Sequence, residues 1–465
     1  MKILLIEPRG VSQYLHSGLA YLASALANDN QVKVFDLNFL NLSEAELNEK
    51  IIEENPDLVG ISIKSANAKK ALALAELVRS VSKSILVCGG PHITLCGLNF
   101  FNQEAHGLFD FGFSGETEIS FPSFCQAINQ KTNYEAIAGL IFLKDGSWQQ
   151  NQPGFVNDLN TLSFPDFSVF AGVNLSNLSY PLLTSRGCPY SCIYCSVNKV
   201  SGRKWRFRSP QNIVDELKAA KEKYRFNDFK IMDDNFTLDQ QRAIDFCQIL
   251  EKENLGLRWG CPNGIRADKL DAPTIAAMKR AGCESVSLGI ESGDPTVFAR
   301  IKKGEVLEDI KKAAELLKAG GIKVNGFFIV GLPGDSIGAT RKSVEFINQL
   351  KLNGTKWNFL IPYPQTELWD WVSQNGKFLA DFTEGKHFSR NNENIIPVFE
   401  TNDFSARQRI RAYKIANLAT GNYSYVFKKP KNRLYFYFKL FFYFLYYTPE
   451  TLVKKIRKRL FKSSS

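Results

Sequence analysis

Apolar segments alternate with amphipathic ones along the centre of the chain, between residues 180 and 366. Short runs rich in β-branched and aromatic residues predict strands, and apolar residues three or four apart predict helices between them. The expected strands are 181–185, 229–232, 257–260, 285–290, 323–330 and 356–361, and the expected helices are 212–224, 239–252, 272–281, 306–319 and 337–350. This alternation indicates a parallel sheet, and the segment is too short for a closed eightfold barrel of about 250 residues. We therefore expect an α/β fold with an open, partial six-stranded (β/α)6 TIM-type barrel.

The first part of the chain shows a second alternating pattern. Short apolar strands are expected at 2–6, 32–36, 58–62, 85–88 and 109–113, with helical stretches between them. Such a pattern is typical of a doubly wound, Rossmann-like α/β domain. Ligands of these domains bind at the carboxyl ends of the strands.

The length and composition permit several domains. The chain has 465 residues and a hydrophobic content of 44%, enough for two or three hydrophobic cores. We expect the Rossmann-like domain over 1–135, a linker over 136–178, the barrel over 179–366, a helical C-terminal extension whose part 367–424 closes the substrate site, and a tail over 425–465. The opening apolar run, Ile3 to Ile6, is too short for a signal peptide.

Three of the nine cysteines lie close together, as Cys188, Cys192 and Cys195, with the spacing C-x3-C-x2-C. Three thiolates on one loop can hold an iron-sulfur cluster and leave one iron open for chemistry. Zinc is an alternative, but it prefers a fourth Cys or His nearby, and His106 and His387 are far away in sequence. The other six cysteines are scattered, which favours a reducing, cytoplasmic location over a disulfide framework.

Further motifs follow the cysteine loop, each where an apolar run ends. They are Met232-Asp233-Asp234-Asn235, Asn263-Gly264-Ile265-Arg266, Gly289-Ile290-Glu291-Ser292, Gly326 to Gly334 and Pro362-Tyr363-Pro364. In this order, together with the cysteine loop, they resemble the radical S-adenosylmethionine (SAM) enzymes. That resemblance implies a [4Fe-4S] cluster on Cys188, Cys192 and Cys195, with SAM bound at its open iron.

The resemblance also implies roles for the other motif residues. Asp233, Asp234 and Asn235 would accept hydrogen bonds from the SAM amino group, and Glu291 and Ser292 would meet the ribose hydroxyls. Arg266, with Asn263, would face the SAM carboxylate or the substrate. Gly326 and Gly331 would let backbone approach the adenine. Each motif also has a purely structural alternative, because an Asp-Asp-Asn turn can cap a helix and a Gly-Leu-Pro-Gly segment can form a turn.

The loops at the ends of the expected N-terminal strands include Gly60-Ile61-Ser62, Cys88-Gly89-Gly90-Pro91-His92 and Ser114-Gly115-Glu116-Thr117-Glu118. Together they resemble the cobalamin-binding domain that is often fused ahead of a radical SAM barrel. By this resemblance, Ser62, Gly89 and Gly90 would line the slot for the nucleotide tail of cobalamin, and His92 would be a positioning or turn residue. The histidine motif that coordinates cobalt is missing, because Tyr14 and Leu19 stand where it requires Asp and Gly around His16. We therefore do not assign His16 as a ligand. A domain of this shape without cobalamin stays an alternative.

The tail holds most of the net charge. Residues 425–465 contain eleven Lys and Arg and one acidic residue, against a net charge of +11 for the whole chain. Ten of the fourteen residues at 434–447 are aromatic, too short a segment to span a bilayer but suited to its headgroup region. We expect peripheral contact with the inner membrane surface. A terminal helix packed on the barrel is the alternative, and we expect no nucleic acid partner.

Taken with the resemblance, these features predict an enzyme that reductively cleaves SAM with electrons from an external donor. The expected activity is cobalamin-dependent methyl transfer to an unactivated carbon of a small, apolar or lipid-linked substrate. One alternative is a radical SAM enzyme of the same architecture that cyclises, couples or oxidises its substrate without methyl transfer. Another is a cofactor carrier without turnover.

Overall fold

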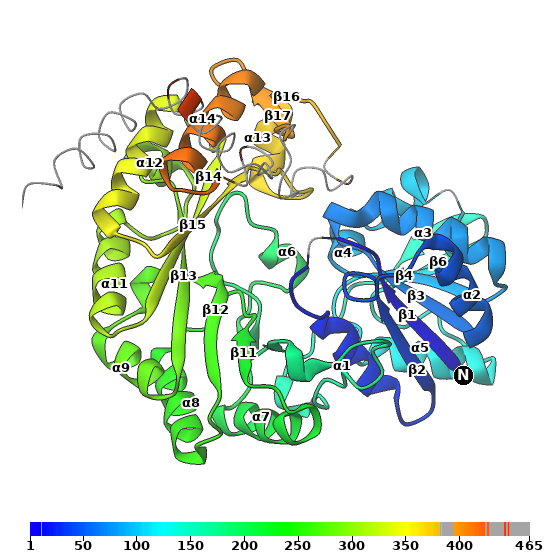
Figure 1. The fold of residues 1–465 in the computed structure, drawn as a ribbon. Helices are drawn as coiled ribbons and strands as arrows, with labels where there is room; N and C mark the ends of the chain where they lie inside the picture. Colours follow the sequence, from blue (N-terminus) through cyan, green and yellow to red (C-terminus); the bar gives the residue numbers. More distant parts are fainter. Residues whose placement is uncertain are drawn as a thin grey trace, which may run out of the picture.

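The computed structural model describes residues 1–10, 12–105, 107–381, 383, 395–423, 426, 441, 442 and 445. Two sheets organise this part of the chain, one in the N-terminal domain and one in the barrel (Figure 1). The tail over 425–465, with its predicted membrane contact, lies almost entirely outside the described residues. Among the described residues, no helix has the length and apolar character needed to cross a membrane.

The first sheet has seven strands in the order β2-β1-β3-β4-β5-β6-β7. Its strands are β1 (Lys2–Glu7), β2 (Gln31–Asp36), β3 (Leu58–Ser62), β4 (Ile85–Gly89), β5 (Phe111–Phe113), β6 (Leu140–Lys144) and β7 (Ser147–Gln150). The first five are parallel, in the 2-1-3-4-5 order of doubly wound folds, so a ligand site is expected where β1 and β3 meet. The helices are α1 (Ser17–Leu26), α2 (Glu44–Glu54), α3 (Ala68–Val81), α4 (Pro91–Cys96) and α5 (Ser120–Gln130).

Strands β6 and β7 form an antiparallel hairpin that extends this sheet from β5. They fall in the segment 136–178 that the sequence predicts as a linker. The turn at Lys144–Gly146 is readable from local sequence. The pairing of β6 with β5 is a contact between distant segments, which local patterns do not reveal.

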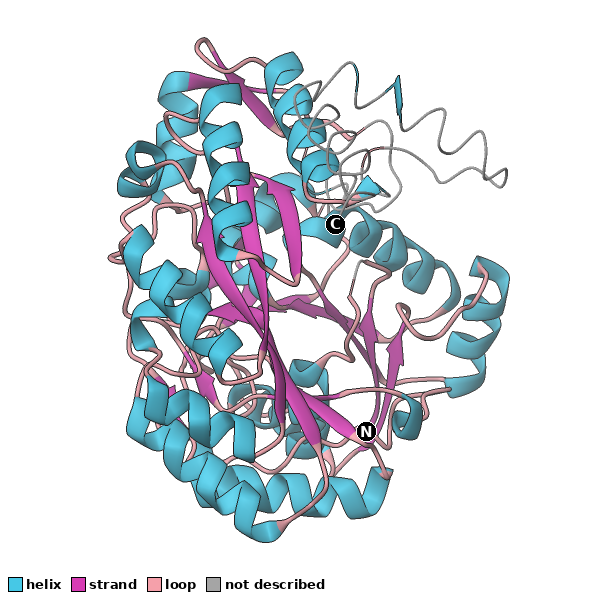
Figure 2. Ribbon diagram, turned by 60° about the vertical axis from the view of Figure 1, so that its left-hand side comes forward, coloured by secondary structure: helices cyan, strands magenta, loops and turns pink. Residues whose placement is uncertain are grey.

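The second sheet has six parallel strands in the order β15-β14-β13-β12-β11-β8, without pairing between its two edge strands. They are β8 (Tyr180–Leu182), β11 (Asp228–Ile231), β12 (Arg258–Ile265), β13 (Cys283–Glu291), β14 (Lys323–Val330) and β15 (Gly354–Phe359). Helices cover one face of this sheet (Figure 2). This open barrel confirms the predicted fold class.

The barrel helices begin and end within two residues of the predicted ranges. They are α7 (Pro210–Tyr224), α8 (Gln240–Glu253), α9 (Ala272–Arg280), α11 (Leu307–Ala319) and α12 (Ile337–Leu350). Local chemistry explains their starts, because Ser209, Asp239, Asp271 and Ser336 each accept a backbone N–H in the first turn. Strand β12 runs past its predicted end at 260 to Ile265, with an irregular register after Cys261 that accommodates Pro262.

Shorter elements complete the described chain. Two-residue strands β9 (Ser185–Arg186) and β10 (Arg206–Phe207) pair beside the cysteine loop, which runs into helix α6 (Val197–Val200). Helix α10 (Pro295–Arg300) follows β13, and the C-terminal extension contains α13 (Glu367–Asn375), β16 (Gly376–Phe378), β17 (Phe399–Thr401) and α14 (Ala406–Ala419). Helices α4 and α6 are in contact, so the two domains meet beside the cysteine loop (Figure 1).

Candidate functional site

The cysteine loop is fixed to the barrel by backbone hydrogen bonds. Cys188 N–H donates to the Gly202 carbonyl at 3.2 Å, and Ile193 N–H donates to Ile301 at 3.2 Å. Gly187, at φ +85°, precedes the first cysteine, and a Cβ there would collide with the Lys204 carbonyl. The backbone therefore turns sharply at Gly187, where β9 ends. This turn places the three cysteines at the carboxyl ends of the barrel strands.

All three cysteines line one cavity of about 500 Å³. The expected residues Asp234, Asn235, Arg266 and Glu291 line the same cavity, together with Asn263. Burial raises the pKa of each cysteine thiol, for Cys195 to about 12. The structure thus brings together residues as far apart in sequence as Cys188 and Glu291.

The separation of the three sulfur atoms bears on the zinc alternative. Zinc–sulfur bonds of about 2.3 Å put the sulfur ligands of one zinc ion within roughly 4 Å of each other. Among the described residues, the one group of three His, Cys, Asp or Glu ligand atoms that all lie within 4.8 Å of one another does not include Cys188, Cys192 or Cys195. The three cysteine sulfurs are therefore not placed as close together as the ligands of one zinc ion would be.

Glu291 carries an unusual backbone conformation at the end of β13. Its φ is +63°, in the left-handed region, which costs a non-glycine residue about 1–2 kcal/mol. The side chain is buried, accepts a hydrogen bond from Tyr194 and lies 3.7 Å from Lys303 Nζ. Burial raises the pKa of Glu291 and Lys303 opposes that rise. A strained, buried acceptor that faces a cavity is typical of a ligand-binding position.

Arg266 is held in one orientation. Its guanidinium lies 3.5 Å from the centre of the Tyr190 ring, donates to Asp268 Oδ1 at 2.9 Å and donates to the Lys303 carbonyl at 2.6 Å. Among the described residues, its Nη2 also donates to Asp268 Oδ2 and to the Gly304 carbonyl, each at 3.2 Å, so the second N–H of Nη1 is the donor left for a ligand in the cavity.

Asn235 has unused hydrogen-bonding capacity. Its side chain is buried, and neither its amide nitrogen nor its amide oxygen has a partner within the described part of the chain. Burying an unpaired amide is costly, so a polar ligand in this cavity would relieve that cost.

Asp233 and Asp234 differ in role although they are neighbours. The Asp233 carboxylate accepts hydrogen bonds from Thr184 N–H at 2.6 Å and Ser185 Oγ at 2.6 Å, so it holds the strand ends in place. Asp234 instead faces the cavity. Its side chain is exposed at the cavity, where the protein around it and the nearby Asp233 raise its pKa to about 6.

Three other expected residues do not line this cavity. Ser292 is buried, with its Oγ accepting from Asp294 N–H at 3.2 Å. A Cβ at Gly326 would lie 2.7 Å from Leu352, and one at Gly331 would collide with the Arg409 guanidinium. Protein packing therefore explains why these two positions require glycine.

A second cavity of about 340 Å³ lies between the N-terminal domain and the barrel. Its lining includes the expected Ser62, Gly89 and Gly90, as well as Arg186 from the barrel. Gly90 has φ +102°, and a Cβ there would meet the Ile63 carbonyl at 2.8 Å. Only glycine lets the backbone form this surface, which suits a large flat ligand.

His16 lines the second cavity with both ring nitrogens engaged. Nδ1 accepts from Leu19 N–H at 3.0 Å, and Nε2 lies 3.1 Å from Ser62 Oγ and 3.4 Å from Glu7 Oε2. Burial, helped by Lys64, lowers the pKa of His16 to about 3. A neutral ring with these partners acts as a helix cap. His92 is not among the lining residues and contacts Ser65 instead.

The sequence gives little sign of several other residues at the two cavities. Lys303 is buried at the first cavity, and Glu116 and Glu118 line the second. Glu116 accepts two hydrogen bonds of 2.7 Å from Arg206, and Glu118 accepts one of 2.7 Å from Arg186. The two acidic residues of Gly115-Glu116-Thr117-Glu118 indicate a charged site in the sequence. Their arginine partners are about 70 to 90 positions further along the chain, so the sequence does not reveal the pairing.

These features define a two-domain α/β enzyme that binds cofactors at the carboxyl ends of both sheets. Residues 182–347 match the radical SAM superfamily, and residues 11–124 match the B12 binding domain. The chain belongs to the radical SAM superfamily and carries a cobalamin-binding domain ahead of its radical SAM domain. This membership implies a [4Fe-4S] cluster, SAM and cobalamin, and the two cavities fit them: three thiols and an unpaired amide line the first, and a glycine surface lines the second.

Individual proteins are similar to this chain over most of its length. An uncharacterized methyltransferase of Pyrococcus horikoshii is 27% identical over 82% of this chain and 85% of its own length. An anaerobic magnesium-protoporphyrin IX monomethyl ester cyclase of Rubrivivax gelatinosus is 25% identical over 79% of this chain and 69% of its own. The solved structure of TsrM from Kitasatospora setae, a radical SAM methyltransferase with cobalamin and a [4Fe-4S] cluster bound, superposes with a TM-score of 0.73 at 17% identity, covering 89% of this chain and 90% of that one.

Proposed function

We propose that this enzyme transfers a methyl group to an unactivated carbon of an apolar or lipid-linked substrate. The observation that carries the proposal is that Asp234 lines both cavities. The cavity with the cysteines and the cavity with the glycine surface therefore share a wall. When bound, the cluster and SAM supply radical chemistry, and cobalamin supplies methyl transfer.

The residues of the first cavity would bind and orient SAM. Cys188, Cys192 and Cys195 would ligate the cluster, Arg266 would pair with the SAM carboxylate, and Asn235 would meet a polar group. Glu291, held by Tyr194 and Lys303, would accept hydrogen bonds from two hydroxyls. In the second cavity, Ser62, Gly89 and Gly90 would support cobalamin, and Asp234 would lie between the two cofactors.

The far side of the first cavity supports an apolar substrate. Its lining at the ends of β14 and β15 includes Phe327, Ile329, Phe359, Leu360 and Ile361. These side chains would exclude water from the reacting carbon. Lys356 and Asn358 add polar groups to this wall and would orient the substrate.

Product analysis tests methyl transfer. The holoenzyme, prepared without oxygen, is mixed with SAM and a chemical reductant, and S-adenosylhomocysteine and 5'-deoxyadenosine are both measured. We expect both products, with S-adenosylhomocysteine absent when the protein is prepared without cobalamin. Only 5'-deoxyadenosine in the presence of bound cobalamin would contradict methyl transfer. That result would favour the second candidate, a reaction without methyl transfer, which the similarity to the cyclase supports.

We also propose peripheral membrane contact through the tail over 425–465, because its sequence is basic and aromatic. The full chain and a chain ending at residue 424 would be sedimented with anionic and with neutral liposomes. We expect the full chain to sediment with anionic liposomes and the shortened chain to stay in the supernatant. Equal sedimentation of both chains would contradict the proposal.

A further inference from the structure

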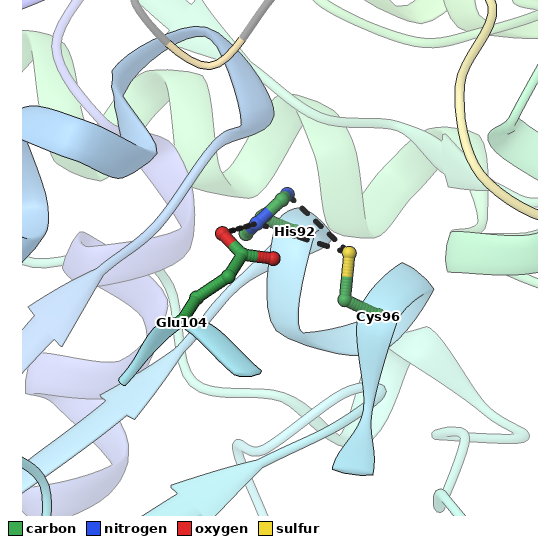
Figure 3. A group of neighbouring side chains, drawn as sticks. All are labelled: His92, Cys96 and Glu104. Carbon is green, nitrogen blue, oxygen red and sulfur yellow. Dashed lines mark hydrogen bonds and ion pairs between the residues drawn. The ribbon is translucent and has the colours of Figure 1, made fainter. Parts of the chain in front are cut away.

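A third group of chemically reactive side chains lies apart from both cavities. Within the described residues, His92, Cys96 and Glu104 are the one set of three His, Cys, Asp or Glu side chains whose ligand atoms all lie within 4.8 Å of one another. His92 and Cys96 are four residues apart on α4, so they share a face of the helix. Glu104 reaches the same point from the turn Phe100–Glu104, and Figure 3 shows the imidazole between the thiol and the carboxylate.

The three ligand atoms are close enough together for one shared metal ion. His92 Nε2 lies 3.7 Å from Glu104 Oε2, and Cys96 Sγ makes weak contacts of 3.8 Å with Nε2 and 3.7 Å with Nδ1. The nitrogen–oxygen distance exceeds the usual hydrogen-bond length. Zinc bonds of about 2.0–2.3 Å in a tetrahedron separate neighbouring ligand atoms by roughly 3.3–3.6 Å, so a small shift of each side chain would complete the coordination.

The hydrogen bonds of His92 favour Nε2 as the metal-binding nitrogen. Nδ1 lies 3.1 Å from Ser65 Oγ, which can accept its proton, and the Phe100 ring packs at a right angle against the imidazole. His92 is 1% exposed, so this arrangement is fixed by packing. Metal-binding histidines ordinarily donate the other ring N–H to such an outer partner.

The position of the group indicates what a bound ion would do. Pro91 and Thr94 line the second cavity, whereas His92 and Cys96 do not. The carbonyl of Leu95 accepts a hydrogen bond from the Gln365 side chain of the barrel. An ion would therefore tie α4 to the turn behind it and stiffen the helix that contributes to the cobalamin cavity and touches the barrel.

We propose that His92, Cys96 and Glu104 bind one zinc-class divalent ion as a structural site. The mixed nitrogen, sulfur and carboxylate donors suit Zn²⁺. Binding releases the thiol proton of Cys96 to solvent. Cys96 and Glu104 are both partly exposed, so water completes the coordination.

The test measures zinc in the full-length holoenzyme, whose cluster cysteines are occupied by iron. The protein is treated with a mild chelator, titrated with Zn²⁺, freed of excess ion and analysed for zinc, iron and cobalt. We expect about one zinc per chain in the wild type and near zero in Cys96→Ala and Glu104→Gln. The Glu104 side chain is partly exposed, so Glu104→Gln tests the site without opening the core. Ser65→Ala should bind zinc 10–100-fold more weakly, as for other outer-partner losses.

Two controls separate this site from other thiols. Cys125→Ala removes a buried thiol from α5 and should keep one zinc. A variant with Cys188, Cys192 and Cys195 all changed to Ala should also keep one zinc while it loses iron. With Co²⁺ in place of zinc, a thiolate-to-cobalt absorption band should appear in wild type and be absent from Cys96→Ala. Equal zinc in wild type, Cys96→Ala and Glu104→Gln, or no zinc in wild type, would overturn the proposal.

Discussion

The two cavities use different means to form a binding surface. The first combines three thiols with carboxylates, cations and an apolar wall. The second has more glycines and, besides charged residues such as Glu116, Glu118 and Arg186, mostly small or apolar side chains. Side-chain chemistry decides what the first cavity holds, so single-atom changes there should abolish binding. Backbone shape decides what the second holds, so changes in bulk should matter more than changes in charge. Asp234 belongs to both cavities and is the point where the two kinds of site meet.

Loss of one cysteine should have the largest effect on the contents of the first cavity and none on those of the second. We expect Cys192→Ala to reduce iron from about four per chain to near zero and to abolish SAM cleavage, because a cluster with two protein ligands is not retained. Cobalamin content should stay unchanged. Iron and cobalamin analysis of this variant beside Cys261→Ala, a buried cysteine of β12, provides the measurement. Retained iron in Cys192→Ala would show that the cysteine loop does not hold the cluster.

The wall between the domains contains a buried ion pair whose loss should be costly. In Glu116→Gln, Arg206 would lose its paired charge in a buried position, and we expect the free energy of unfolding to fall by about 3–5 kcal/mol. Glu135→Gln is the matched control, because its 2.7 Å pair with Lys144 is exposed and should contribute under about 1 kcal/mol. Denaturant titration measures both. Similar decreases in the free energy of unfolding in the two variants would show that burial does not make the Glu116–Arg206 pair more important.

Bulk added to the second cavity should affect cobalamin and spare the cluster. In Gly90→Ala the new methyl group meets the Ile63 carbonyl, so we expect cobalamin affinity to fall about tenfold, with strain of about 1–3 kcal/mol. Iron content should not change. Gly146→Ala is the control, because its φ is +76° and nothing lies within 4 Å of its Cβ position. If both variants bind cobalamin as wild type does, the glycine surface is not the cobalamin site.

The smallest expected effect is the loss of stability when Asp166 is changed, and it depends on pH. Asp166 lies in the segment 136–178 between the N-terminal domain and the barrel. Burial raises the pKa of Asp166, but hydrogen bonds from Lys223, Ser168 and Tyr224 outweigh it and lower the value from 3.8 to about 2. A lowered carboxyl pKa stabilises the fold above the unfolded value and loses that effect as pH falls from 3.8 toward 2. At 1.36 kcal/mol per unit the shift corresponds to roughly 2.4 kcal/mol, but the side chain is 26% exposed and solvent screens its contacts. We therefore expect Asp166→Asn to cost about 1 kcal/mol at pH 7.

Urea unfolding at several pH values checks this prediction. The difference between wild type and Asp166→Asn should shrink as pH approaches 2. Asp145→Asn, at an exposed turn, should show little difference at any pH. A difference for Asp166→Asn that does not change between pH 7 and pH 3 would exclude the carboxylate as its cause.

The sequence predicts features that depend on local order better than those that depend on distant contacts. Helix limits follow from caps such as Ser209. The cysteine spacing predicts the cluster loop, and the structure places its three thiols at one cavity. The motif at 233–235 was predicted as one unit, but the structure turns Asp233 toward Thr184 and Asp234 toward the cavities. Adjacent residues of an irregular turn point in different directions, and only the surrounding strands decide which one reaches the ligand.

Packing partners from remote segments explain the other differences. Gly331 resembles a ligand-binding glycine in sequence, but Arg409 of α14 fills the space beside it. His92 follows the glycine turn of the second cavity, yet the helix that begins there turns it toward Ser65. Lys303 escaped prediction because no local pattern distinguishes it from a surface lysine, although the structure buries it beside Glu291.

Cofactor content tests most directly the claim that the two cavities hold different cofactors side by side. The protein would be purified without oxygen from cells supplied with cobalamin, and iron and cobalamin would be measured per chain. The account predicts near one cobalamin together with about four irons. Iron without cobalamin would contradict it, because the glycine-lined cavity would then be a structural feature of the domain interface.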